Sequence, residues 1–256
     1  MTPLLGALVL LFIIAPLAGM ILQTSPVQIF DTFKDQEVTA SIWLTVRTSL
    51  FATLLFSLSA IPLAWLLARK SFPGKKLVTG LIDLPVVIPH SAAGIAVLGL
   101  ISRDTALGRM ASSAGFDLVG NPIGISLAMA FVSIPFLINA ARDGFLGVPE
   151  RLEKAALTLG ASPSRIFFTV SLPLAWRSIL SGLIMMFARG MSEFGAVIMV
   201  AYHPMITPIL IFERFNSFGL KYARPVAVAF ILVTLALFIL LRFLSGDPRE
   251  KKRNSG

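Results

Sequence analysis

The sequence has no cysteine and few charged residues. Only 14% of its 256 residues are Asp, Glu, Lys or Arg, whereas a water-soluble domain carries about 25%. This is too little charge to cover a water-facing surface, and 56% of the residues are hydrophobic, so most of the chain must meet lipid. The lack of cysteine excludes a disulfide framework and a thiolate metal site. The composition predicts an integral membrane protein.

Motifs that would carry chemistry are also missing. The two histidines, His90 and His203, have no neighbouring ligand residues, so no metal site is predicted. The nearest fragment to a G-x-x-x-x-G-K-[ST] nucleotide loop is Gly74-Lys75-Lys76, which lacks the first glycine and the hydroxyl residue. The absence of HExxH, of GxSxG and of facing carboxylates argues against an intramembrane enzyme. No cofactor is predicted in this chain, and any ATP must bind to another chain.

Six apolar runs are long enough to cross a membrane, since a spanning helix needs about 20 residues. An all-α, polytopic fold with six transmembrane helices is therefore predicted, arranged as a single transmembrane domain over 1–256. The expected spans are 3–23, 41–68, 81–101, 122–141, 178–201 and 224–243.

The distribution of basic residues predicts the orientation of these spans. Segments 69–80, 142–177 and the tail from 242 hold twice as many Lys and Arg residues as the segments on the other side. Basic residues favour the cytoplasmic side, so both termini are predicted there, in a multi-pass protein of the cell membrane. The net charge of +9 is explained by these clusters, and no nucleic acid partner is expected. A short basic cytoplasmic tail is predicted at about 243–256.

The cytoplasmic stretch LEKAALTLGASPSRIFFTVSLP, residues 152–173, is too long for a plain connection. Its pattern predicts a helix over 150–159 with an apolar stripe, a left-handed stop at Gly160, and a second helix capped by Ser162 and limited by Pro173. The stripe consists of Leu152, Ala155, Ala156 and Leu159. Periodicity leaves two interpretations open: an amphipathic helix resting on the lipid headgroups, or a helix that docks into a groove of a cytoplasmic partner.

The same stretch resembles the permease subunits of binding-protein-dependent ABC importers. Those subunits carry Glu-Ala-Ala, three residues, Gly, nine residues and Ile-x-Leu-Pro, and the sequence matches this spacing with two departures. Lys154 replaces the motif Glu, with Glu153 one place earlier, and Val170 replaces Ile. The resemblance implies a coupling segment within the loop 142–177 that binds the ATPase subunit. Its candidate residues are Glu153, Lys154, Ala155, Ala156, Gly160, Leu172 and Pro173.

Two further stretches, DLPVVIPHSAAGIAVLG (83–99) and FARGMSEFGAVIMVAYHPMITPILIFERF (187–215), resemble permeases for tetrahedral oxyanions, nearest to the molybdate/tungstate branch. This resemblance implies the type I importer fold. It also implies four kinds of partner: a second copy of the chain, two ABC ATPase subunits that bind ATP and Mg, an extracytoplasmic oxyanion-binding protein, and the bilayer. The outer segments 24–40 and 202–223 are expected to receive the binding protein.

Charged and bend-forming residues inside the spans are candidates for the transport pathway or its gate. Arg189 and Glu193, four residues apart, form either a self-neutralising ion pair or a source of positive potential along the anion path. Prolines and glycines in the third and fifth spans permit close packing or mark bends that gate the path. The full candidate set is Asp83, Pro85, Pro89, Ser91, Arg189, Ser192 and Glu193.

ATP-driven import of molybdate or tungstate is the leading hypothesis for function. A permease for sulfate or thiosulfate is the alternative within the same class. An ion-coupled secondary transporter is the alternative from another class, and it would make the coupling motif accidental.

Overall fold

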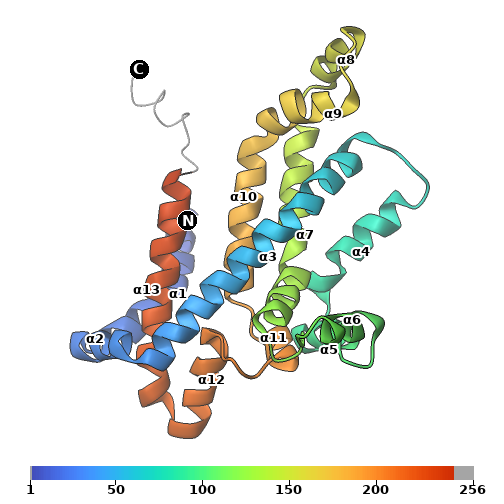
Figure 1. Ribbon diagram of the computed structural model, residues 1–256. Coiled ribbons are helices and arrows are strands. Elements are labelled where there is room, and N and C mark those ends of the chain that lie inside the picture. Colours follow the sequence, from blue (N-terminus) through green and yellow to red (C-terminus); the bar gives the residue numbers. More distant parts are fainter. Residues whose placement is uncertain (1, 245–256) are drawn as a thin grey trace. The chain divides into compact units, whose positions relative to one another are not determined.

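The computed structural model describes residues 2–244, and helices make up all the regular structure of this part of the chain (Figure 1). The elements are α1 (Thr2–Leu22), α2 (Pro26–Lys34), α3 (Gln36–Arg69), α4 (Lys75–Val87), α5 (His90–Ile101), α6 (Ala106–Ser113), α7 (Pro122–Leu146), α8 (Glu150–Thr158), α9 (Pro163–Ile166), the π-helical turn η1 (Phe167–Ser171), α10 (Leu172–Met191), α11 (Gly195–Val200), α12 (Thr207–Phe218) and α13 (Leu220–Leu244).

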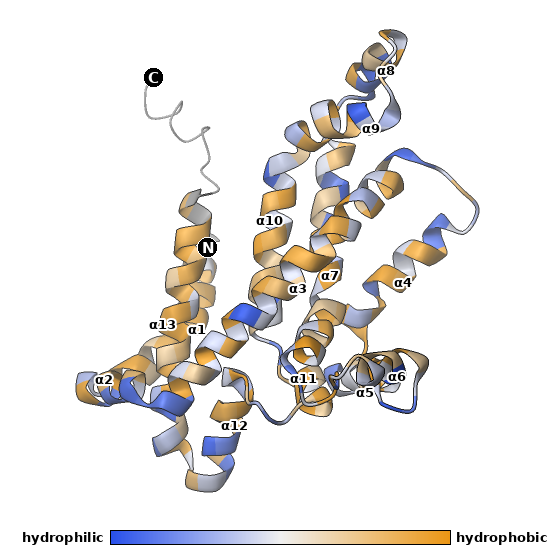
Figure 2. Ribbon diagram, in the orientation of Figure 1, coloured by the Kyte–Doolittle hydropathy of each residue, from blue (hydrophilic) through white to orange (hydrophobic). Residues whose placement is uncertain are grey.

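The helices fall into two compact units. One unit comprises Met1–Thr45 with Met205–Leu237, and so contains α1, α2 and α12. The other is built on Val46–Pro204, where α7 and α10 run side by side and α11 packs on α5 (Figure 1). Apolar residues dominate the long helices, and polar residues gather in α2 and in the α8–α9 segment (Figure 2).

Among residues 2–244, five helices are long and apolar enough to cross a membrane, and the bent pair α4–α5 makes six if it counts as one span. This confirms the predicted polytopic, all-helical fold with six spans. The spans predicted at 3–23, 41–68, 122–141 and 224–243 correspond to α1, α3, α7 and α13. The tail predicted at 243–256 lies, from 245 onward, outside the described residues.

The third predicted span is wrong as a single helix. The chain leaves α4 at Val87 and resumes in α5 at His90, and the two helices are bent by 113°. Pro89 causes the break, because it has no N–H to donate and forces Ile88 out of the helical region, to a ψ of 151°. Pro85 remains inside α4 without interrupting it.

The fifth predicted span, 178–201, is also wrong at both ends. The helix ends at Met191, and α11 begins only at Gly195. At its other end, Pro173 does not limit the preceding helix as expected, since α9, η1 and α10 form one candidate span from Pro163 to Met191. The wider π-helical turn has the Leu172 N–H bonded to the Phe167 carbonyl, which relieves the usual clash of a proline ring with the turn before it.

The segments expected to be outer loops contain short helices. In α2, Ser25 and Gln28 form a capping box, and in α6 the Thr105 hydroxyl accepts the N–H of Gly108. These caps satisfy amide groups at the helix starts, which lets short helices form outside the spans.

Candidate functional site

The segment 150–171 folds as the sequence predicts, into a helix, a turn and a second helix. Acidic residues in the first turn of α8 favour its start, and Gly160, with φ of +82°, ends it in the left-handed conformation. The Ser162 hydroxyl then accepts the N–H of Arg165, and Pro163 occupies the first position of α9.

The apolar stripe of α8 faces away from the rest of the chain. Leu152 is 43% exposed and Leu159 is 88% exposed. Ala155 is exposed and Ala156 is half-buried. Exposed apolar patches of this kind are typical of surfaces that contact another protein or a membrane.

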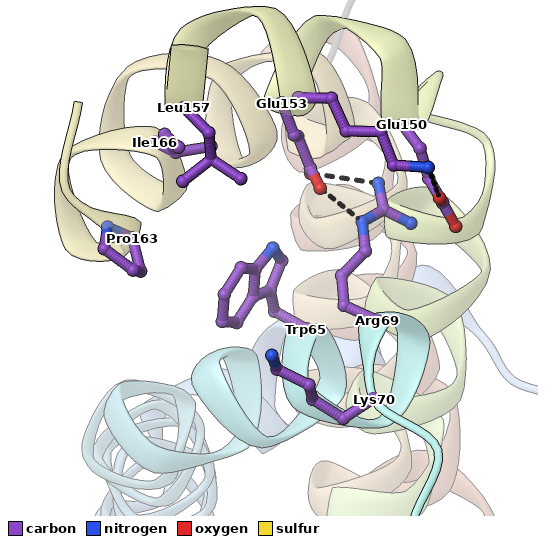
Figure 3. A pocket seen from close by; sticks show the side chains of 9 residues that line it. Trp65, Arg69, Lys70, Glu150, Glu153, Leu157, Pro163 and Ile166 are labelled. Atoms are coloured by element: carbon purple, nitrogen blue, oxygen red, sulfur yellow. Dashed lines mark hydrogen bonds and ion pairs between the residues drawn. The ribbon is translucent and has the colours of Figure 1, made fainter. Parts of the chain in front are cut away.

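One charged residue of α8, Glu153, points inward instead. The Glu153 carboxylate is buried and receives a bidentate contact from Arg69, at the end of α3: Nε lies 2.7 Å from Oε2, and Nη2 lies 3.0 Å from Oε1 (Figure 3). The Ser171 hydroxyl donates to the same carboxylate at 2.6 Å. Arg69 also donates to the Val148 carbonyl at 3.0 Å.

These contacts govern the ionisation of Glu153. Burial by itself would raise the pKa of this carboxyl group, but the hydrogen bonds from Arg69 and Ser171 favour the charged form and lower the pKa below its ordinary value. Lys154 differs from its neighbour: its side chain is 72% exposed and pairs with Glu150 at 3.0 Å on the surface. Of the two charged residues predicted at the motif position, Lys154 is the exposed one and Glu153 the buried one.

A cleft of about 250 Å³ lies between the end of α3 and the α8–α9 segment (Figure 3). Trp65 and Lys70 line it from the side of α3, and Leu157, Pro163 and Ile166 line it from the other. The other predicted motif residues, Leu172 and Pro173, begin α10, where Leu172 is half-buried and Pro173 is exposed.

A second cluster of charged residues forms where two helix breaks meet. Arg189, in the last turn of α10, lies 2.8 Å from the carboxylate of Glu193, which has no exposed surface. The other oxygen of Glu193 accepts the N–H of Ala196 at 2.8 Å, and so caps the start of α11. The predicted pairing of Arg189 with Glu193 is confirmed in geometry.

His90 joins this cluster, and the sequence did not indicate it. Its Nδ1 lies 2.9 Å from Glu193 and 2.9 Å from an Arg189 nitrogen. The His90 side chain is 40% exposed and that of Arg189 is 21% exposed. The pairing depends on the bend at Pro89, which turns the first residue of α5 toward the end of α10, so only the Pro-His pair at a predicted bend could have suggested it.

Of the other predicted pathway residues, Ser192 lies in this cluster, where its hydroxyl accepts a hydrogen bond from Arg189 at 3.4 Å, whereas Asp83 and Pro85 lie in α4. Asp83 accepts a hydrogen bond from Asn139 of α7 at 2.7 Å. Pro85 is buried in α4, whereas Ser91 and Ser192 are exposed. Within the described residues, no group of three or more His, Cys, Asp or Glu residues could hold a metal ion.

The glycines of the third and fifth predicted spans allow close packing between α5 and α11. A Cβ atom added to Gly94 would lie 2.6 Å from the Ala196 carbonyl oxygen, and one added to Gly195 would lie 2.7 Å from the His90 Cβ. Small residues at such contacts are typical of membrane helices.

In the other compact unit, Arg214 joins the two segments expected to receive a binding protein. Its Nη2 lies 2.7 Å from Asp35 and 2.9 Å from Glu37. Burial would raise the pKa of the Asp35 carboxyl group, but the contact with Arg214 and the hydrogen bonds from the backbone N–H groups of Glu37 and Val38 together outweigh it, and the pKa is lowered.

A family model described as "Binding-protein-dependent transport system inner membrane component" matches residues 60–247. The chain belongs to this family. It is thus a membrane component of a transport system that works with a binding protein, and it is not an enzyme.

Several proteins resemble this family member along most of its length. The molybdate/tungstate transport system permease protein WtpB of Thermococcus kodakarensis is 43% identical, over 94% of this chain and 94% of the relative. WtpB of Pyrococcus furiosus is 44% identical, over 96% and 94%. A probable sulfate transport system permease protein of Chlorokybus atmophyticus is less similar, with 32% identity over 77% and 69%.

The fold agrees with this membership. A bacterial ABC transporter that imports the acidic polysaccharide alginate superposes with a TM-score of 0.72, over 95% of this chain and 93% of that chain, at 18% identity. The family member therefore has the fold of an ABC importer permease.

Proposed function

We propose that the chain is the membrane-spanning subunit of an ATP-driven importer for molybdate or tungstate. The observation that carries the proposal is the segment 150–171, whose α8 exposes its apolar stripe and Lys154 and turns Glu153 inward. Such a surface suits a groove on a second protein. The names of the relatives at 43–44% identity support the choice of oxyanion, and the relative named for sulfate is more distant.

The complete importer then contains two copies of this chain, two ABC ATPase subunits that bind ATP and Mg, and an external oxyanion-binding protein. Both termini lie in the cytoplasm, as the distribution of basic residues favours. ATP binding closes the ATPase subunits and draws the two α8 segments together, which opens the path to the outside. ATP hydrolysis then closes the path to the outside and opens it to the inside.

Residues of the docking segment and of the pathway have separate roles in this proposal. Lys154, Ala155 and Ala156 contact the ATPase subunit, while Gly160, Leu172 and Pro173 shape the segment. Arg189, next to the exposed face of His90, gives positive potential along the anion path, and Glu193 orients it. Asp83, Pro85, Pro89, Ser91 and Ser192 remain candidates for the pathway or gate.

The test begins with purification of the chain from detergent extracts of its native membrane. A stoichiometric ATPase partner supports the proposal, and Lys154→Glu is expected to weaken its retention. Purification without any ATPase would favour a secondary transporter instead. Titration calorimetry of the cognate binding protein with molybdate, tungstate and sulfate then decides the anion, because the receptor selects it before the permease meets it. Tight binding of sulfate alone would overturn the choice of molybdate or tungstate.

A further inference from the structure

Four segments of the chain meet at the ion pair of Arg69 and Glu153. Arg69 reaches it from the end of α3, Ser171 from the π-helical turn, and Glu153 itself comes from α8. The same guanidinium holds the Val148 carbonyl, in the connection between α7 and α8. We call Arg69, Glu153 and Ser171 the latch.

The latch is better suited to fixing geometry than to adding stability. A buried ion pair gains little net stability, because both charges lose their water. A bidentate contact between a guanidinium and a carboxylate, however, fixes both distance and orientation, which a single Lys contact does not. The Arg69 and Glu153 side chains are only 8% and 11% exposed, so solvent does not compete for these bonds.

Apart from the latch, α8 packs on α9 and on the π-helical turn. Its apolar stripe faces outward, and its two connections are Gly147-Val148-Pro149 and the left-handed turn at Gly160. Each connection contains a glycine, Gly147 or Gly160, which permits backbone changes that other residues resist. A displacement of α8 would therefore be absorbed at these connections unless α8 is tied directly to the helices that cross the membrane.

We propose that the latch is the rigid link that carries the displacement of α8 into the membrane, through Arg69 to α3 and through Ser171 to α10. Arg69, Glu153 and Ser171 are thus positioning residues for energy coupling, whereas Lys154 belongs to the surface that binds the ATPase. This inference rests on the proposed function, since it needs an ATPase that moves α8.

The test uses the full importer with its ATPase and binding protein in proteoliposomes. Nitroxide labels go on cysteines placed at Lys70, just after α3, and at Arg151 on α8, both of which are exposed. The chain has no other thiol. Pulsed electron paramagnetic resonance measures the distance between the labels in complexes with one labelled copy, without nucleotide and with trapped ATP. Molybdate uptake per ATP hydrolysed is measured in parallel on unlabelled complexes.

In the wild type, the distance between the labels should be the same in both states. In Glu153→Gln and Arg69→Met, the distance distribution should widen and shift with trapped ATP, and uptake per ATP should fall about tenfold with the ATPase still bound. Arg69→Lys, which keeps the charge but loses the bidentate contact, should fall between them, and Ser171→Ala should have the smallest effect. If Arg69→Met does not assemble into an importer, Arg69→Lys and Ser171→Ala provide the test of the latch.

Asp143→Asn is the matched control. Asp143 lies near the end of α7 that leads into α8. Its carboxylate pairs with Arg142 at 3.6 Å, but its side chain is 69% exposed. The coupling of this variant should match the wild type. Unchanged uptake per ATP in all latch variants would overturn the inference, as would losses that only follow the amount of assembled complex, or a wild-type distance that differs between the two states. A wild-type importer without bound ATPase or ATP-driven uptake would instead refute the proposed function.

Discussion

Gly94 allows the sharpest test of the helix packing around the broken third span. A Cβ atom at this position would lie 2.6 Å from the Ala196 carbonyl oxygen and 2.8 Å from both the Ala196 Cα and the Met199 Cβ. Two of these atoms belong to the backbone of α11 and cannot move alone. Gly94→Ala must therefore push α5 and α11 apart by roughly 0.8 Å, the difference from the 3.4 Å at which ordinary contact begins.

The expected loss of stability follows from this separation. Overpacking of this kind costs about 1–3 kcal/mol. For a chain of this size, each kcal/mol lowers the midpoint of thermal unfolding by about 2–4 °C, so a decrease of about 2–12 °C is expected. Circular dichroism at a helix wavelength, followed in detergent during heating, measures it.

Gly99→Ala in the same helix is the control. No atom lies within 4 Å of a Cβ added there, so the substitution only removes the flexibility of glycine from a helix. It should leave the midpoint unchanged or stabilise the chain by about 0.5–1 kcal/mol. Equal midpoints for the two alanine variants would refute the close approach of α5 and α11.

Three further predictions concern the charged clusters. Arg189→Met leaves the Glu193 carboxylate buried without its cation and should destabilise the chain by about 3–5 kcal/mol. The double variant Arg189→Met with Glu193→Gln should unfold near the wild-type temperature but still import the anion more slowly. Normal uptake by the double variant would leave Arg189 only a structural role. Because the pKa of Glu153 is lowered, its stabilising contribution is complete above the ordinary carboxyl range and is lost as the pH falls through the lowered value. Hydrogen exchange of α8 amides, corrected for intrinsic rates, should thus show constant protection from pH 7 to about pH 5, and a loss that begins near pH 6 would contradict this. Arg214→Met should lower stability by about 1 kcal/mol, because the ion pairs that it breaks are partly exposed; a salt titration of thermal unfolding checks this, since the wild-type advantage should shrink at high salt, and an advantage that does not change with salt would contradict it.

Local patterns in the sequence predicted much of this structure. Apolar runs of sufficient length located four spans correctly, because lipid leaves few alternatives to a helix. The turn at Gly160 and the cap at Ser162 have local causes, namely a left-handed backbone and an amide group in need of an acceptor. Such features depend on residues within one turn of each other, so spacing alone reveals them.

The remaining features depend on residues far apart in the chain. Pro62, Pro85 and Pro135 lie inside helices, yet Pro89 ends one, and the sequence around them does not distinguish these cases. The partner of Glu153 is 84 residues away. Spacing could place Glu153 in the docking segment, but only the fold shows that its carboxylate turns toward its own chain.

The bend between α4 and α5 also determines which surroundings its exposed apolar residues can have, compared with those of an unbroken helix such as α1. Helix ends leave backbone N–H and C=O groups without partners in their own helix, and hydrocarbon offers none. Val87, at the bend, is 79% exposed, much like Phe12 of α1 at 80%. Phe12 lies within an unbroken helix and can face acyl chains directly, but the surface around Val87 must be sealed by protein or wetted. Exposed apolar residues on α1 can therefore face lipid directly, whereas those at the bend need protein or water beside the open backbone groups.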